Sequence, residues 1–251
     1  MLEKNIIYNE NCLDTMIKMP DNFVDLTVTS PPYDNLRTYD SYNKGCFNFE
    51  KVACELYRVT KFGGVLVWVV GDATIKGSET GTSFRQALWF KDVCGFNLHD
   101  TMIYMKDGIS FPDKNRYQQC FEYMFIFSKG EPKTKNLISD RKNKSFGRKV
   151  TGTDRDANGK TRKASCYGQQ IKEYGIRWNI WQMNNTKNNG KRKHPAPFPE
   201  QLANDHIISW SNEEDLIYDP FMGSGTTAKM ALLNNRDFIG SEIITKLAIA
   251  V

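Results

Sequence analysis

DLIYDPFMGSGTTAKMALLNN, residues 215–235, is the stretch that decides the fold. It begins as a short apolar run, turns through Gly223 and Gly225, and continues as a segment with helical apolar spacing that opens at Thr226 and Thr227. In a doubly wound sheet, ligands sit beyond the carboxyl ends of the strands, where such a turn lies. The glycines let the backbone turn sharply and approach a ligand, because no Cβ atom stands in the way.

An acid follows this corner. Glu242 lies just past the next predicted strand, DFIGSEI at 237–243, where a carboxylate can accept hydrogen bonds from both hydroxyls of a ribose. The glycine loop does not match GxxxxGK[ST], which disfavours a P-loop NTPase. Ala228 stands where a dinucleotide fingerprint has its third glycine, so a hydride-transferring dehydrogenase fits less well. A nucleoside ligand is the resulting expectation.

In the rest of the chain, predicted strands alternate with predicted helices, which favours an α/β fold with a mostly parallel sheet. VLVWVV, at 65–70, is continuously apolar, as expected of a strand that is buried on both faces. FGG, at 62–64, is expected to end the helix that precedes it. Further strands are predicted at 6–8, 24–30, 101–105 and 121–127, and helices at 12–19, 49–60, 83–94 and within 198–210.

Composition is that of an ordinary globular protein. The 251 residues are 40% hydrophobic and 25% charged, enough for one large domain. The polar start MLEKNIIYNENC does not resemble a signal peptide, and no apolar run reaches the length of a membrane span. The six cysteines form no CxxC pair and the three histidines are not spaced like zinc ligands. We expect a cytoplasmic protein with reduced thiols and without a metal site.

Positive charge is concentrated in one segment. Residues 133–193 carry 17 Lys and Arg against four acids, although the whole chain has a net charge of only +5. Aromatic side chains lie between these charges, at Phe146, Tyr167, Tyr174, Trp178 and Trp181. Cations interleaved with aromatic rings suit a polyanion with stackable bases, which favours nucleic acid. A solvated face or a disordered loop is the alternative.

TSPPY, residues 29–33, ends another predicted strand. Proline has no backbone N–H and cannot continue a central strand, so this strand should end at Ser30 or Pro31. The turn then presents a hydroxyl, a rigid backbone and an aromatic ring just beyond the tip of the strand. Pro31 and Pro32 fix the direction of the backbone there, and Tyr33 follows them.

Together, TSPPY and DPFMGSGTT (219–227) resemble the motifs of the S-adenosylmethionine-dependent DNA amino-methyltransferases. The catalytic motif comes first and the cofactor motif last, with the basic insertion between them, which resembles the β group of that family. The segments at 6–33 and KHPAPFPEQL at 193–202 are similar to the family's opening and to the segment before its cofactor loop. The resemblance covers the chain except for about 131–176.

This resemblance implies a Rossmann-like class I methyltransferase fold, with helices on both faces of a mostly parallel sheet. Residues 1–130 and 196–251 would form the catalytic and cofactor-binding domain, and 131–195 an inserted DNA target-recognition region. A base flipped out of double-stranded DNA would lie at the Ser-Pro-Pro-Tyr turn. The Ser30 hydroxyl and the Pro31 carbonyl would then accept hydrogen bonds from its amino group, and Tyr33 would stack on the base.

The resemblance also implies a cofactor site and DNA contacts. Asn11 and Cys12 should lie near the adenine ring, although many relatives have Asp in place of Asn11, and Glu242 should bind the ribose. Phe198, with Glu200, should close the pocket; packing at a helix start is the alternative role for Phe198. The methionine side of the cofactor is assigned to Asp219, Phe221, Gly223, Gly225 and Thr226, and DNA contacts to Arg37, Lys191, Arg192 and Lys193.

Several alternatives stay open. Serine before Pro-Pro-Tyr is most common in cytosine-N4 enzymes, and adenine N6 is the alternative target. A DNA-binding relative without catalysis, or a methyltransferase of RNA or protein, is a competing interpretation. Methylation of cytosine C5 is disfavoured because the chain has no Pro-Cys pair. A homodimer and the endonuclease of a restriction–modification pair are further expected partners, and the recognition sequence cannot be read from the residues.

Overall fold

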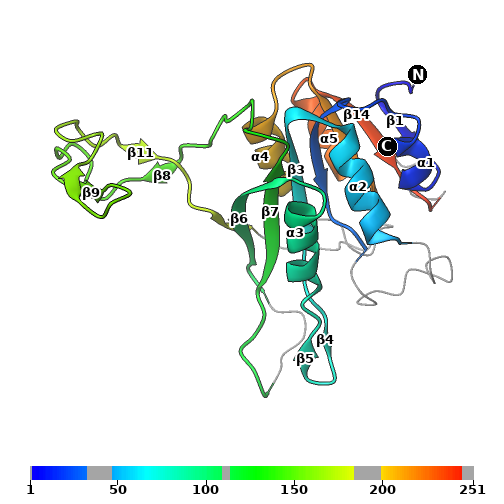
Figure 1. Cartoon of the computed structure of the whole chain (residues 1–251), viewed down its shortest axis with the longest axis horizontal. Coiled ribbons are helices and arrows are strands. Elements are labelled where there is room, and N and C mark those ends of the chain that lie inside the picture. The colour runs from blue at the N-terminus through cyan, green and yellow to red at the C-terminus, as the bar shows by residue number, and fades with distance from the viewer. Residues whose placement is uncertain (1, 33–46, 109–113, 184–198, 245–251) are drawn as a thin grey trace. The chain divides into compact units, whose positions relative to one another are not determined.

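The computed structural model describes residues 2–32, 47–108, 114–183 and 199–244. An eight-stranded sheet with the order β1-β14-β13-β2-β3-β7-β6-β12 forms its centre (Figure 1). All neighbouring strands are parallel except β7, which runs antiparallel to both β3 and β6. The strands are β1 (Ile6–Tyr8), β2 (Val24–Thr29), β3 (Thr60–Val70), β6 (Asn97–Lys106), β7 (Phe121–Ser128), β12 (Ile180–Met183), β13 (Leu216–Asp219) and β14 (Asp237–Ser241).

Helices pack on both faces of this sheet, as Figure 1 shows, and each face has its own apolar core. The helices α1 (Cys12–Met16), α2 (Phe49–Val59) and α3 (Thr82–Asp92) cover one face. The other face is covered by α4 (Glu200–Trp210) and α5 (Thr226–Leu233). Strand β3 serves both cores, because Val65, Val67 and Val69 point into one and its alternate residues into the other. This explains the uninterrupted apolar run.

The helix before FGG ends as predicted, but FGG itself belongs to a strand. Helix α2 ends at Val59, and β3 begins directly at Thr60 and continues through both glycines. A Cβ atom on Gly64 would stand 2.9 Å from the carbonyl oxygen of Asp25, and Gly63 has φ +82° and bonds the backbone of Lys129 at 2.7 Å. The glycines therefore permit a close approach of neighbouring backbones within the sheet.

Three short two-stranded sheets have no counterpart among the elements predicted from the sequence. In β4 (Thr74–Ile75) and β5 (Ser78–Glu79), the turn residues Lys76 and Gly77 both have positive φ. This is the backbone of the two-residue turn that matches the twist of the flanking strands. A second hairpin is formed by β9 (Thr153–Arg155) and β10 (Thr161–Lys163). The third sheet pairs β8 (Arg141–Lys142) antiparallel with β11 (Tyr174–Gly175), and the second hairpin lies between these two strands in the chain.

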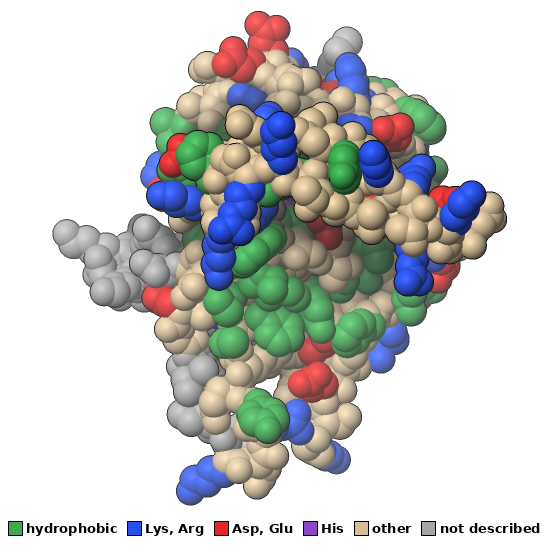
Figure 2. Space-filling model, turned by 90° about the vertical axis from the view of Figure 1, so that its left-hand side faces the viewer, with side chains coloured by type: hydrophobic (Ala, Val, Ile, Leu, Met, Phe, Trp, Pro, Cys, Tyr) green, Lys and Arg blue, Asp and Glu red, His purple; other side chains and the backbone are tan. Residues whose placement is uncertain are grey.

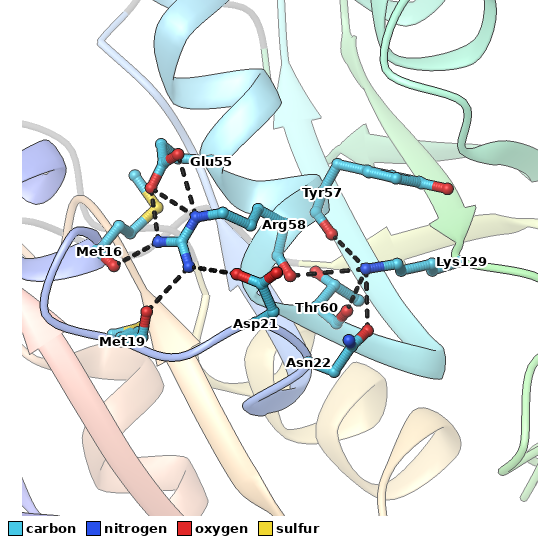
Figure 3. A network of polar contacts seen from close by, with 9 residues as sticks. All are labelled: Met16, Met19, Asp21, Asn22, Glu55, Tyr57, Arg58, Thr60 and Lys129. Atoms are coloured by element: carbon cyan, nitrogen blue, oxygen red, sulfur yellow. Dashed lines mark hydrogen bonds and ion pairs between the residues drawn. The ribbon is translucent and has the colours of Figure 1, made fainter. Parts of the chain in front are cut away.

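Two cationic side chains, Arg58 and Lys129, form hydrogen bonds that connect α1, α2 and β3 (Figure 3). The guanidinium of Arg58 donates to the carbonyl oxygens of Met16 and Met19 and forms ion pairs with Asp21 and Glu55. These carboxylates raise the pKa of Arg58 further above its usual range. Lys129, at the end of β7, donates to the carbonyls of Tyr57 and Thr60 and to Asn22. Carbonyls at the ends of both helices thereby obtain donors.

Residues 137–178 form a compact unit of their own, and the remaining described residues form another. The smaller unit contains two turns with the same bonding pattern, at 143–150 and 164–171, each with an exposed aromatic residue, Phe146 or Tyr167, before a left-handed glycine. The turns pair through reciprocal backbone hydrogen bonds: Gly147 N to Ile171 O (3.0 Å), Gly168 N to Val150 O (2.8 Å), Val150 N to Gln169 O (2.9 Å) and Ile171 N to Arg148 O (2.9 Å). The backbone hydrogen bonds from the first turn to the second are thus repeated from the second to the first, so that the two turns are related by an approximate local two-fold symmetry.

Among the helices that the structure describes, none is both long and apolar enough to span a membrane.

Candidate active site

The glycine loop between β13 and α5 is shaped by its backbone. Gly223 has φ +55°, and Gly225, which precedes α5, has φ +82°, a region that other residues rarely adopt. The backbone N–H of Met222 donates to Ser241 at the end of β14, which holds the loop against that strand. A Cβ atom on Gly240 would collide with the end of the Met222 side chain. The loop therefore packs directly on β14 and leads straight into α5.

Glu242 lies beside this loop, as its position past β14 predicted. Its carboxylate accepts from the backbone N–H of Gly223 at 2.8 Å and from that of Ile244 at 2.8 Å, one on each oxygen. The residue is buried, and the Asn9 side chain bonds its backbone carbonyl at 2.7 Å. Each carboxylate oxygen keeps a further lone pair. A fixed carboxylate with two such acceptors fits the adjacent hydroxyls of a ribose.

Asp219 joins the cofactor loop to the strand that carries the Ser-Pro-Pro turn. It ends β13, and its carboxylate accepts from the hydroxyl of Thr29 at 2.6 Å and from that of Thr227 at 2.7 Å. It also accepts from the backbone N–H of Phe221 at 3.0 Å. Only 1% of the surface of Asp219 is exposed. From this buried position its side chain connects the end of β2, the glycine loop and the start of α5. We call this set, Asp219 with Thr29, Phe221 and Thr227, the aspartate clasp.

Burial raises the pKa of Asp219 to about 6, although its hydrogen bonds act in the opposite direction. Removal from water disfavours the charged carboxylate, and the two threonine hydroxyls and the Phe221 N–H only partly compensate. The clasp therefore gains a proton on moderate acidification, while its geometry keeps both carboxylate oxygens occupied.

Ser30 follows β2 directly and lies next to the clasped Thr29. It is half-buried, Pro31 is buried, and Pro32 is half-buried. Strands β2 and β13 are parallel neighbours, with Thr27 opposite Tyr218, so the turn after β2 and the glycine loop after β13 leave the same edge of the sheet. Tyr33 lies outside the described residues, as do Arg37, Lys191, Arg192, Lys193 and Phe198.

Asn11 and Cys12 lie at the start of α1. The Asn11 side-chain oxygen accepts from the backbone N–H of Leu13 at 3.0 Å and so caps the helix. This capping role was not anticipated from the sequence, where the residue was assigned only to the adenine ring. Cys12 is buried, and burial raises the pKa of its thiol to about 12, which keeps it neutral. The contacts of both residues with a cofactor stay a prediction.

Phe221 and Thr226 occupy the two ends of the glycine loop. The ring of Phe221 packs edge-on against Phe47, with 5.4 Å between ring centroids, and lies 6.3 Å from Trp68. Thr226 is half-buried in the first turn of α5. Both are placed beside the loop as expected, and their cofactor contacts stay predictions.

Three residues of this site were missed from the sequence. Thr29 and Thr227 hold Asp219, and Tyr218 donates or accepts at 3.0 Å with the Ser241 hydroxyl inside the core. A signal existed for Thr29, because a polar residue at the end of an otherwise buried strand needs a hydrogen-bond partner. The identity of the partner could not be found, since Thr29 and Asp219 are 190 residues apart in the chain.

Comparisons with known proteins agree with this arrangement. The chain is 63% identical over 231 residues to the orphan methyltransferase M.BamHII of Bacillus amyloliquefaciens, a match that covers 89% of this chain and 85% of the relative. It is 27% identical over 272 residues to the type II methyltransferase M1.MboII of Moraxella bovis, which covers 97% of this chain and 93% of that one.

Solved structures share the fold. The cytosine-N4-specific PvuII DNA methyltransferase superposes with a TM-score of 0.70 at 23% identity, over 97% of this chain and 83% of that one. A putative DNA modification methylase from Thermus thermophilus, solved with S-adenosyl-L-methionine, superposes with a TM-score of 0.65 at 21% identity, over 98% and 90%.

The strand order and the helices on both faces of the sheet give a Rossmann-like α/β fold of the class I methyltransferase type, as predicted. A family model described as "DNA methylase" matches residues 24–248, nearly the whole chain. The chain therefore belongs to this family of DNA methyltransferases, whose members modify cytosine N4 or adenine N6 and use S-adenosylmethionine. The expectations of family, enzyme class and cofactor are confirmed.

Proposed function

We propose that this enzyme transfers a methyl group to the N4 amino group of a cytosine flipped out of a specific DNA sequence. The observation that carries the proposal is the aspartate clasp, which ties the strand before Ser30 to the glycine loop through Asp219. The lean to cytosine rests on the residue type at Ser30, because serine at this place is most common in cytosine-N4 enzymes. Adenine N6 is the alternative target.

An exocyclic amine is a poor nucleophile, because its lone pair is delocalised into the ring. The proposed role of the Ser30 hydroxyl and the Pro31 carbonyl is to accept the two N–H bonds, so that the lone pair turns toward the methyl group. The prolines fix the backbone in advance, and the clasp fixes Thr29 beside it, so that little reorganisation accompanies the reaction. Tyr33 is proposed to stack on the flipped base.

S-adenosylmethionine, when bound, supplies an electrophilic methyl group on a sulfonium. The residues present fit it: Glu242 offers two fixed acceptors, and the loop offers close backbone approach at Gly223 and Gly225. We assign Glu242 to the ribose. The loop and Asp219 we assign to the methionine side, with Asp219 acting through the loop that it holds.

The direct test is mass spectrometry of nucleosides from plasmid DNA incubated with the enzyme and S-adenosylmethionine. We expect N4-methylcytosine, and none when the cofactor is left out. N6-methyladenine instead would overturn the assignment of the base but keep the reaction class. No methylated nucleoside would contradict the proposed function, provided that calorimetry with the same preparation shows that the cofactor binds.

Glu242→Ala should weaken S-adenosylmethionine binding by about tenfold or more, because it removes hydrogen bonds to a charged acceptor. Isothermal titration calorimetry gives the affinity directly. Glu213→Ala, which changes an exposed acid at some distance in the chain, is the matched control. Equal affinities in the two variants would show that Glu242 only accepts hydrogen bonds from the backbone of Gly223 and Ile244 and does not bind the ribose.

We assign target recognition to residues 131–195, of which residues 137–178 form the compact unit described above. That unit carries eleven Lys and Arg against four acids, and one acid, Asp140, is already paired with Arg177 at 2.5 Å. Its exposed aromatic residues include Trp178, over which Arg141 lies at 5.3 Å. Cations for phosphates and rings for bases are thus presented together.

Replacing Lys144 and Lys149 together by Ala should reduce the salt dependence of DNA binding. Both are exposed in the first of the paired turns. Each phosphate that is no longer neutralised should flatten the log–log slope by about 0.9, because one counterion fewer is released. Binding to all sequences should weaken alike. The double replacement of Lys51 and Lys91, exposed on helices α2 and α3, is the control; identical slopes for both doubles would place the first pair away from DNA.

The homodimer, the partner endonuclease and the cytoplasmic location stay predictions.

A further inference from the structure

Two segments project from the same edge of the sheet. One is the β4–β5 hairpin, which follows β3, and the other is the stretch 114–120, which precedes β7 (Figure 1). All residues of the hairpin from 74 to 79 are exposed. Ile75 at its tip is 51% exposed, and Tyr117 in the second segment is fully exposed. Tyr117 therefore buries no surface within the described protein, and about half of Ile75 faces solvent.

The two projections are tied together and anchored. Arg116 donates to the carbonyl of Gly77 in the hairpin turn at 2.6 Å and lies 3.8 Å from Glu79. At the base of the hairpin, Thr80 bonds the Asp72 carboxylate at 3.2 Å, and Ser83, the second residue of α3, bonds it through both its hydroxyl and its backbone. The projections are therefore a connected structure, and we call residues 74–79 with 114–120 the hairpin wedge.

The wedge lies at the catalytic edge. Strands β2 and β3 are parallel neighbours, and Thr29 pairs with Trp68. Ser30 follows Thr29 directly, and the hairpin begins only four residues after the end of β3 at Val70. The Ser-Pro-Pro turn and the base of the hairpin thus leave adjacent strands in the same direction. A duplex that brings a base to Ser30 approaches this edge of the sheet.

The side chains of the wedge match one particular feature of such a duplex. Lys76 is exposed at the hairpin turn, and Lys114 is exposed close to Tyr117 in the chain. Figure 2 shows hydrophobic and basic side chains together at the lower end of the view, where Figure 1 places these projections. When a base leaves the stack, it leaves an apolar gap between its former neighbours, bordered by phosphates. Apolar tips flanked by lysines fit that gap.

We propose that the hairpin wedge enters the DNA where the target base has left it, with Ile75 and Tyr117 in the gap and Lys76 and Lys114 on the flanking phosphates. This inference rests on the proposed function, since it requires a flipped base. The wedge lowers the free energy of the open duplex by replacing the stacking that the flipped base gives up. It contributes to opening the base pair, and it takes no part in binding the cofactor.

The test compares Tyr117→Ala and Ile75→Ala with wild type on two duplexes, built once the methylated sequence has been mapped on plasmid DNA. One duplex has the normal base opposite the target, and the other has an abasic site there. On the paired duplex, kcat/KM should fall about tenfold or more for Tyr117→Ala, because stacking on a base is lost. On the abasic duplex, where no pair needs to be opened, the defect should shrink to about threefold or less.

Phe62→Ala is the control, because it removes an exposed aromatic ring near the opposite end of β3. All variants should keep the thermal midpoint and the S-adenosylmethionine affinity of wild type. An equal loss on both duplexes would overturn the proposal, since the residues would then act outside base-pair opening. Full activity in both variants would overturn it too. A wild-type enzyme that methylates neither duplex would instead contradict the proposed function.

Discussion

Asp219→Ala should abolish methyl transfer and destabilise the protein by about 2–4 kcal/mol, because it leaves buried donors without an acceptor. The hydroxyls of Thr29 and Thr227 and the N–H of Phe221 all donate to this carboxylate. Without it, the strand before Ser30 and the glycine loop lose their common attachment. Urea unfolding measures the stability, and single-turnover methyl transfer measures the activity.

Asp219→Asn is the matched variant. The asparagine oxygen can still accept from Thr29, and its amide nitrogen can donate to the Thr227 hydroxyl, which also lies 3.3 Å from the carbonyl of Val28. The geometry of the clasp should therefore survive, and the activity should be far above that of the alanine variant. Equal inactivity of both variants, with both folded, would mean that the charge of Asp219 acts on the reaction and that its role is not positional.

Wild type and Asp219→Asn should differ in how the free energy of unfolding depends on pH. The pKa of Asp219 is raised by burial to about 6, well above its value in an unfolded chain. The native state therefore holds more protons than the unfolded state between about pH 6 and pH 4, and this residue contributes more stability as the pH falls through that window. As the pH falls from about 6 to about 4, Asp219→Asn should therefore lose stability relative to wild type.

Ser30→Ala should lower the rate of methyl transfer about a hundredfold or more, because a preorganised group that acts on the reacting atoms is removed. Ser30 follows β2 directly, and the residue that bonds Asp219 is Thr29, so replacement of Ser30 should leave Asp219 and the glycine loop in place. S-adenosylmethionine affinity should therefore stay within about twofold of wild type. Single-turnover assays with radiolabelled cofactor give the rate, and calorimetry gives the affinity.

Ser139→Ala, at an exposed serine of the smaller unit, controls for the general effect of losing a hydroxyl. If Ser30→Ala turned over at the same rate as this control, the hydroxyl would not orient the amine. The Pro31 carbonyl would then have to act alone. A parallel loss of cofactor affinity would instead show that Ser30 belongs to the cofactor pocket.

The sequence predicted the sheet well wherever residue types and hydrophobic period agreed. Strand β3 is an example, since a run that is apolar at every position can only be buried on both faces. Glu242 is another, because its place past a strand next to the glycine loop brings it to Gly223. Such features depend on short stretches of chain and on the general geometry of parallel sheets.

Other features depend on contacts that no local pattern contains. The partner of Thr29 is set by the order of strands, which brings β13 next to β2. The FGG segment gives the usual signal of a break, yet the neighbouring backbone at Asp25 requires glycine inside a strand. The β4–β5 hairpin has only two residues in each strand, too few for a hydrophobic period. Tertiary contacts decided each of these cases.

The strand order β1-β14-β13-β2 also bears on how the protein is made. Strands β13 and β14 follow all other strands that the structure describes, but they lie between β1 and β2, which precede the others. Synthesis proceeds at about 5–20 residues per second. Strand β2 cannot pair with β13 until residues 216–219 have left the ribosome, and β1 cannot pair with β14 until residues 237–241 have done so. Until then, β1 has no parallel partner and one side of β2 is an open edge, the kind of surface that aggregates or recruits chaperones. The glycine loop therefore comes to lie beside the Ser-Pro-Pro turn only after β13 and β14 have been translated.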